Sequence, residues 1–151
     1  MLTTTVGPLP SDHPPVTPTP EKLSSRRLVV VVDDNPMVQD ALRLCLEGWD
    51  VDCIAVSTAA EALAVLRVVE RRPDLIFSDY NLNDGQRGDQ AIRAIRDVHG
   101  KDIPAMMFTG DMTHGNAEVR GKIAAFGIPL LTKPITGRVL KDTIDWLKSR
   151  P

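Results

Sequence analysis

The stretch PDLIFSDYN, residues 73–81, decides the fold of this 151-residue chain. Its apolar run from Leu75 to Phe77 does not alternate with polar residues, and the chain is then mostly polar from Asp79 to Gly88. A short apolar run followed by turn residues is typical of a strand buried on both faces of a parallel sheet. The pattern therefore predicts that Asp79 lies at the carboxyl end of a buried strand, where open α/β sheets bind their ligands.

Three other segments have the same form, an apolar run that ends in polar residues. They are Leu28–Val32 before Asp33 and Asp34, Ile103–Phe108 before Thr109, Gly110 and Asp111, and Ile128–Leu131 before Thr132, Lys133 and Pro134. If the strands are parallel neighbours, their carboxyl ends meet at one edge of the sheet. We therefore expect the polar groups that follow the strands to converge there. They are the carboxylates of Asp33, Asp34 and Asp79, the hydroxyl of Thr109 and the ammonium group of Lys133.

Helical patterns separate these strands along the chain. Asn35 is a suitable N-cap before Pro36, and Thr58 with Glu61 three residues later forms a capping-box pattern. The expected helices cover residues 36–48, 58–71, 88–100, 116–126 and 136–148, and a further strand covers residues 51–56. This alternation predicts a doubly wound, three-layer α/β sandwich around a five-stranded parallel sheet.

The apolar residues of these helices recur at a spacing of three and four, which predicts the faces that pack on the sheet. These faces include Cys45 in the first helix, Val98 in the third and Val139 in the last. Cys45 and Cys53 both lie in apolar segments and lack the spacing of metal ligands. We therefore expect two buried free thiols in a reducing compartment.

Length and composition indicate one domain, at residues 26–149, behind a tail at residues 1–25. The tail holds six of the twelve prolines and five threonines, so it cannot bury enough apolar surface to offset its ordering entropy and is expected to be disordered. The charge is nearly balanced, with 18 basic and 20 acidic residues, which gives no electrostatic case for nucleic acid or an anionic membrane. Neither a membrane span nor a secretory signal is evident, and we expect a cytoplasmic protein.

The residue types at the sheet edge suit a cation and a phosphoryl group. Mg²⁺ prefers oxygen ligands and usually retains several waters, so Asp33, Asp34 and Asp79 together form a candidate site. Asp79 is the candidate nucleophile, because a carboxylate that attacks phosphorus needs no general base. Lys133 and the Thr109 hydroxyl can then stabilise the charge on the phosphoryl oxygens. Taken singly, each of these residues is more often a turn residue, a strand end or a solvated side chain; only the set indicates a site.

The same set carries a family resemblance. The motifs are Val31-Val32-Asp33-Asp34-Asn35, Asp74-Leu75-Ile76-Phe77-Ser78-Asp79, Phe108-Thr109-Gly110 and Thr132-Lys133-Pro134. All four in this order, each at its own strand end, resemble the receiver domain of two-component response regulators over about residues 26–149, which implies a flavodoxin-like fold. Tyr80 after Asp79, and the run from Leu130 to Pro134, look most like receivers of hybrid histidine kinases.

The resemblance implies a role for each matching residue. Asp79 would be the phosphoacceptor in a phosphorelay, and Asp33, Asp34, Asp79 and the backbone carbonyl of Asn81 would hold Mg²⁺. Thr109 and Lys133 would contact the phosphoryl group, while Asn81 and Asp111 would tune its hydrolysis. The implied partners are a histidine kinase or histidine phosphotransfer domain, an unidentified downstream protein and, through the fourth helix, fifth strand and last helix, a weak homodimer. No conventional enzyme activity is implied beyond self-phosphorylation from phosphohistidine and slow hydrolysis of the aspartyl phosphate.

The chain departs from the family pattern in two places. Leu130 stands where many receivers have an aromatic residue three positions before the lysine, so the usual threonine–aromatic relay is not expected. The loop after Asp79 has Asn83 where a proline is common, and it runs slightly long to Gly88.

Two alternative functions belong to other classes. A pseudo-receiver would bind partners on the same fold without accepting phosphate, and the intact Asp34, Asp79, Thr109 and Lys133 argue against it. A dinucleotide or flavin site would require a glycine-rich turn after the first strand. Here that turn is the acidic segment from Asp33 to Pro36, which repels phosphate unless a cation intervenes.

Overall fold

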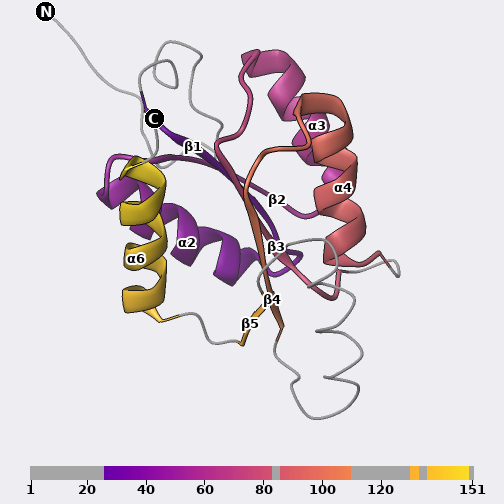
Figure 1. The fold of residues 1–151 in the computed structure, drawn as a ribbon. Helices are drawn as coiled ribbons and strands as arrows, with labels where there is room; N and C mark the ends of the chain where they lie inside the picture. Colours follow the sequence, from indigo (N-terminus) through magenta and orange to yellow (C-terminus); the bar gives the residue numbers. More distant parts are fainter. Residues whose placement is uncertain (1–25, 83–85, 110–129, 133–135, 150–151) are drawn as a thin grey trace, which may run out of the picture.

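Five parallel strands form a single sheet in the order β2-β1-β3-β4-β5 (Figure 1). The strands are β1 (Leu28–Val32), β2 (Asp52–Val56), β3 (Leu75–Asp79), β4 (Ala105–Thr109) and β5 (Leu130–Thr132). This computed structural model describes residues 26–82, 86–109, 130–132 and 136–149. The strand order reverses between β1 and β3, so the predicted doubly wound parallel fold is confirmed.

In the described part of the chain, two helices cover each face of the sheet. Helices α2 (Pro36–Gly48) and α6 (Gly137–Ser149) lie on one face, and α3 (Ala59–Val69) and α4 (Gly88–His99) lie on the other (Figure 1). Successive side chains of a strand point to opposite faces. Val30 of β1 accordingly packs in the cluster with α3 and α4, while Val29 and Val31 pack in the cluster with α2 and α6.

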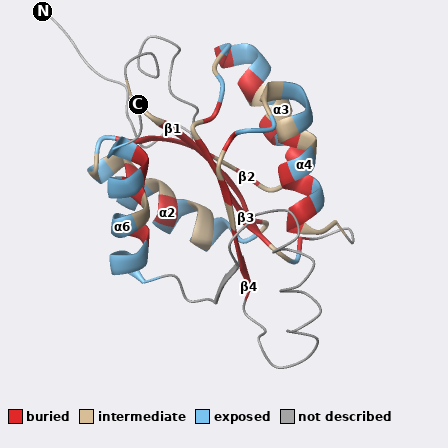
Figure 2. Ribbon diagram, in the orientation of Figure 1, coloured by how far each residue is buried: buried red, intermediate tan, exposed pale blue. Residues whose placement is uncertain are grey.

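Strand β1 contributes side chains to both clusters. All five of its side chains are fully buried, and the buried positions of the helices face the sheet (Figure 2). Full burial of a valine or leucine side chain stabilises the fold by about 1.5–3 kcal/mol. An uninterrupted apolar strand is therefore required here, because a polar residue at any position of β1 would be desolvated on one face or the other.

The predicted helix starts at Asn35 and Thr58 are confirmed. The Asn35 side chain accepts a hydrogen bond from the Met37 N–H at 2.9 Å, and the Thr58 hydroxyl accepts one from the Glu61 N–H at 3.1 Å. The Ser57 N–H, one residue before the cap, donates a hydrogen bond to the Glu61 carboxylate at 2.8 Å. These bonds satisfy backbone donors that the first turn of a helix leaves free.

The structure corrects several sequence-based expectations. Cys45, Val98 and Val139 are exposed or partly exposed rather than inward-facing. Cys45 is rotated by roughly 100° about the helix axis from Leu46, which is the buried residue, so it falls at the rim of the apolar stripe. The apolar run at 103–108 also forms a strand only from Ala105, and Ile103 and Pro104 precede β4. The expected helix at 116–126 and the tail at 1–25 lie outside the described residues.

None of the helices in the described ranges is both long enough and apolar enough to span a membrane.

The two cysteines differ in environment, and this predicts different reactivity. Burial raises the pKa of the Cys53 thiol to about 12, whereas Cys45 is exposed on α2. The thiolate is the reactive form, so we expect iodoacetamide at pH 8 to modify Cys45 alone in the native protein and both cysteines in denaturant. Peptide mass spectrometry locates the modification. Rapid alkylation of Cys53 under native conditions would contradict the packing of β2 against α2.

Candidate functional site

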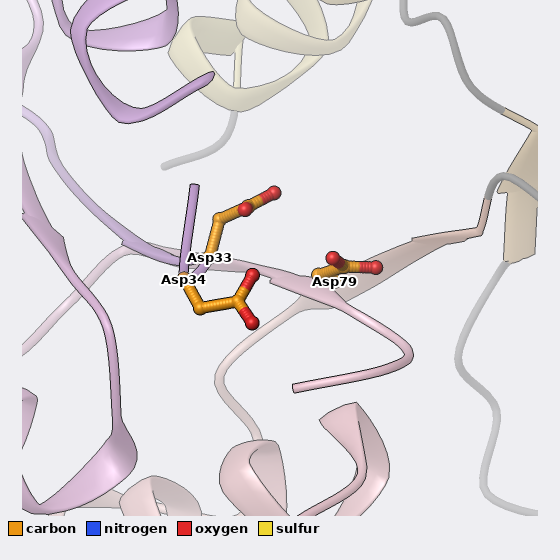
Figure 3. A group of neighbouring side chains, drawn as sticks. All are labelled: Asp33, Asp34 and Asp79. Atoms are coloured by element: carbon orange, nitrogen blue, oxygen red, sulfur yellow. The ribbon is translucent and has the colours of Figure 1, made fainter. Parts of the chain in front are cut away.

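Three carboxylates meet at the carboxyl edge of the sheet, as the sequence predicts (Figure 3). Asp33 and Asp34 follow β1, and Asp79 is the last residue of β3. The two strands are hydrogen-bonded neighbours in which Val32 pairs with Ser78, so Asp33 and Asp79 occupy corresponding positions. One oxygen from each of the three side chains lies within 4.8 Å of the others.

The turn after β1 is held by hydrogen bonds that Asp33 makes. The Asp33 N–H donates to the Val56 carbonyl at 2.9 Å, and one Asp33 carboxylate oxygen accepts from the Asn35 N–H at 2.8 Å. The Gln39 amide also donates to the Asp33 carbonyl. Asp33 is fully buried, while Asp34 is half-buried beside it. These contacts fix one oxygen of Asp33 to the backbone and allow the adjacent Asp34 to turn toward the same space.

The donor set fits a magnesium ion. Ligands of an octahedral Mg²⁺ are separated by about 3.0 Å when adjacent and about 4.2 Å when opposite, so oxygens within 4.8 Å of one another could close around the ion with side-chain adjustment. Two of the three carboxylates are buried, where like charges repel strongly without a cation. The three carboxylates therefore form a candidate Mg²⁺ site.

The structure places Thr109 at the same edge. Thr109 is the last residue of β4, its side chain is buried, and Asp79 pairs with the preceding residue, Phe108. The Tyr80 N–H donates to the Phe108 carbonyl at 2.9 Å, which keeps β3 and β4 together up to this point. Lys133 and Asp111 lie outside the described residues, so their place at the site stays a prediction.

The backbone of Asn81 also lies beside the cluster. Its N–H points to a carboxylate oxygen of Asp79 at 3.4 Å, and its side chain is exposed. The residue therefore follows Asp79 closely enough for its backbone to belong to the site, whereas the ligand role of its carbonyl stays a prediction.

Sequence reasoning missed the close packing of Gly88 against Asp79. A Cβ atom at Gly88 would lie 2.3 Å from the Asp79 carbonyl oxygen and 2.8 Å from the Met107 sulfur. The Gly88 N–H donates to the Tyr80 carbonyl at 2.7 Å, which brings the start of α4 onto the end of β3. In the sequence, the position of Gly88 at the end of a polar loop indicates only the start of a helix. Its contact with Asp79 and Met107 joins a helix to two strands, and a local pattern cannot predict it.

Comparison with known proteins identifies the family. The sequence pattern of the response regulator receiver domain matches residues 29–145. The chain belongs to the response regulator receiver family. This receiver is 29% identical over 114 residues to the phosphate regulon transcriptional regulatory protein PhoB of Pseudomonas aeruginosa, a match that covers 76% of the chain and 48% of PhoB. It therefore spans about half the length of that relative.

Solved structures show the same fold. A response regulator receiver protein from Pseudomonas putida has a TM-score of 0.68 and 26% identity, over 83% of this chain and 98% of its own. A sensor protein from Polaromonas sp. JS666 has a TM-score of 0.63 and 27% identity, over 81% of this chain and 98% of its own. The acidic cluster thus lies on a receiver fold in a chain whose sequence also matches the receiver family.

Clustering of the carboxylates predicts that Asp34→Asn changes the free energy of unfolding differently with and without metal. Without metal the substitution removes repulsion and should raise the free energy of unfolding by about 1 kcal/mol. In the wild type, Mg²⁺ at ten times its dissociation constant should add about 1.4 kcal/mol, and most of this gain should disappear in the variant. Urea unfolding in EDTA and in MgCl₂ measures both. Equal Mg²⁺ stabilisation of the two proteins would exclude Asp34 from the metal site.

The packing of Gly88 predicts that Gly88→Ala is destabilising, although alanine is the better helix former. The added methyl group meets backbone at the Asp79 carbonyl, which cannot rotate away, and overpacking of this kind typically costs about 1–3 kcal/mol. Gly48→Ala is the matched control, because a Cβ atom at Gly48 has no neighbour within 4 Å. Urea unfolding of the two variants tests the contact. A Gly88→Ala protein as stable as the control would show that the end of β3 can shift freely.

Proposed function

We propose that this receiver accepts a phosphoryl group on Asp79 and passes on or hydrolyses it, so that its binding to other proteins changes. The observation that supports this most strongly is the gathering of Asp33, Asp34 and Asp79 at one edge of the sheet. A carboxylate nucleophile beside two further carboxylates can react readily with an acyl phosphate or a phosphoramidate when a cation neutralises the site.

The proposed reaction is an in-line transfer. A carboxylate oxygen of Asp79 attacks phosphorus, and the new P–O bond forms as the P–N bond to the donor histidine breaks. The donor imidazole already carries a proton on its other ring nitrogen, so it leaves as neutral imidazole. Asp33, Asp34, Asp79 and the Asn81 carbonyl would hold Mg²⁺, which when bound neutralises charge on the phosphoryl oxygens. Thr109 and Lys133 would donate hydrogen bonds to those oxygens, and Asn81 and Asp111 would set how readily water attacks.

Membership of the receiver family implies a histidine kinase as the general partner. We propose more narrowly that the chain works with, or as part of, a hybrid kinase. Tyr80 and the run from Leu130 to Pro134 support this, as does the similarity to a protein described as a sensor protein. Residues 1–25 would then form a tether, and residues 26–149 the receiver domain. Limited proteolysis tests this division into two parts, and cleavage confined to residues 26–149 would contradict it.

Phosphorylation itself is tested with acetyl phosphate and Mg²⁺. Intact-mass spectrometry should show a gain of one phosphoryl group in the wild type, and no gain in Asp79→Asn or in wild type treated with EDTA. The aspartyl phosphate carries about −1.5 to −2 charges, so it should also shift the protein on native gels. Phosphotransfer from free and hybrid histidine kinases then identifies the donor.

Phosphorylation of the Asp79→Asn protein would show that another residue is the acceptor. A wild type that takes up no phosphoryl group from acetyl phosphate or from any phosphorylated kinase would favour the pseudo-receiver, a protein-interaction module on the same fold.

A further inference from the structure

The loop after the phosphoacceptor is closed at its base by backbone contacts. The Leu82 N–H donates to the Gln86 carbonyl at 3.0 Å, and Asn81 and Arg87 form an antiparallel bridge. The Gly88 N–H donates to the Tyr80 carbonyl one step further down. Asn81, the residue whose carbonyl would face the metal, is thus paired directly with Arg87 across the loop.

Arg87 is itself held by a forked ion pair. Its guanidinium donates two hydrogen bonds to the Asp89 carboxylate, from Nε at 3.0 Å and from Nη2 at 3.1 Å. Two parallel bonds of this kind fix orientation as well as distance. The Arg87 N–H also donates to the Gln90 side chain at 3.0 Å. Both the backbone and the side chain of Arg87 are therefore tied to the first turn of α4.

Asp89 is a rigid anchor for this pair. Its side chain is only 7% exposed, and it lies in the first turn of α4, where the helix dipole favours a negative charge. Burial alone would raise the pKa of Asp89, but hydrogen bonding and attraction to Arg87 outweigh it and lower the pKa. Between the two charged residues lies Gly88, which packs on the Asp79 carbonyl. The ion pair therefore spans the residue that touches the phosphoacceptor.

We propose that the Arg87–Asp89 ion pair is a positioning device that holds the Asn81 backbone in place for Mg²⁺ before the ion binds. This inference rests on the proposed metal site. Mg²⁺ tolerates little deviation from octahedral geometry, and a mobile backbone must lose conformational entropy to provide a ligand to it. An Asn81 backbone that is already held in place avoids that loss when the ion binds.

Simple electrostatics makes a different prediction, which separates the two explanations. If Arg87 and Asp89 acted on Mg²⁺ only through space, removing the arginine would tighten binding and removing the aspartate would weaken it. If the pair positions Asn81, both Arg87→Ala and Asp89→Ala weaken binding. The double variant is then no weaker than the single ones, because either substitution already breaks the contact.

The experiment measures Mg²⁺ affinity by NMR titration of the backbone amides, which also reports whether each variant is folded. We expect the dissociation constant to rise about three- to tenfold in Arg87→Ala, Asp89→Ala and the double variant, at or just below the usual range for groups that orient metal ligands. Arg87→Lys, which keeps the charge and loses the fork, should give a smaller rise. Amide exchange at Leu82 and Gly88 should be faster in the metal-free variants.

Arg72→Ala is the matched control. Arg72 forms an ion pair with Asp102 at 2.6 Å, in the segments that precede β3 and β4, at the opposite edge of the sheet. The Mg²⁺ affinity of the Arg72→Ala variant should equal that of the wild type.

Phosphorylation by acetyl phosphate gives a second readout. In Arg87→Ala the Mg²⁺ concentration for half-maximal rate should rise by the same factor as the dissociation constant, while the rate at saturating Mg²⁺ should match the wild type.

A loss of rate at every Mg²⁺ concentration, or unchanged affinity in folded variants, would overturn the positioning role and leave the proposed function intact. Tighter binding in Arg87→Ala would also overturn it, in favour of the electrostatic explanation. A wild type that binds Mg²⁺ but is never phosphorylated would refute the proposed function alone; one that binds no Mg²⁺ would refute both.

Discussion

The pairing of β1 with β3 is the constraint on which the site depends. Val29 to Val32 lie in parallel register with Leu75 to Ser78, so Asp33 and Asp79 emerge at the same level from adjacent strands. Every side chain of β1 is buried, with Val30 packed on one face and Val29 and Val31 on the other. A slip of one residue would exchange those faces. The same packing that stabilises the sheet thus sets the relative height of the two carboxylates.

The site combines this rigid sheet edge with negative charges that repel each other. Asp33 and Asp79 are buried, and Asp34 is half-buried between them and solvent. The core must supply enough stability to hold them together, because nothing in their mutual interaction favours the arrangement without a cation. A metal bound there would therefore stabilise the protein and neutralise its site in the same event. The proposed phosphoryl group would add to the same electrostatic balance.

The loop after Asp79 shows how a family fold accommodates a local departure. Its sequence has Asn83 where the family resemblance leads us to expect a proline, and it runs slightly long to Gly88. The structure closes the loop with the Asn81–Arg87 bridge, the contact of Gly88 with Asp79 and the forked pair between Arg87 and Asp89. These contacts join the two ends of the loop beside the end of β3.

Much of this could be read from the sequence, because periodicity and capping are local properties. Uninterrupted apolar runs such as Leu28–Val32 and Leu75–Phe77 identified buried parallel strands, and Asn35 and Thr58 identified helix starts. The polar residue at the end of each run, read together with the rule that parallel strands share a carboxyl edge, predicted that Asp33, Asp34 and Asp79 would meet. Cys45 and Val98 were misjudged, since an apolar residue at helical spacing is buried only if a neighbour covers it.

By itself the sequence determined the order of strands and helices along the chain and the residue types at each strand end, because these follow from short-range patterns. Only the tertiary structure decided which strands are neighbours, how closely Gly88 approaches Asp79, and that Arg87 pairs with both Asn81 and Asp89. Those distances depend on the packing of segments far apart in the chain, and no local pattern encodes them.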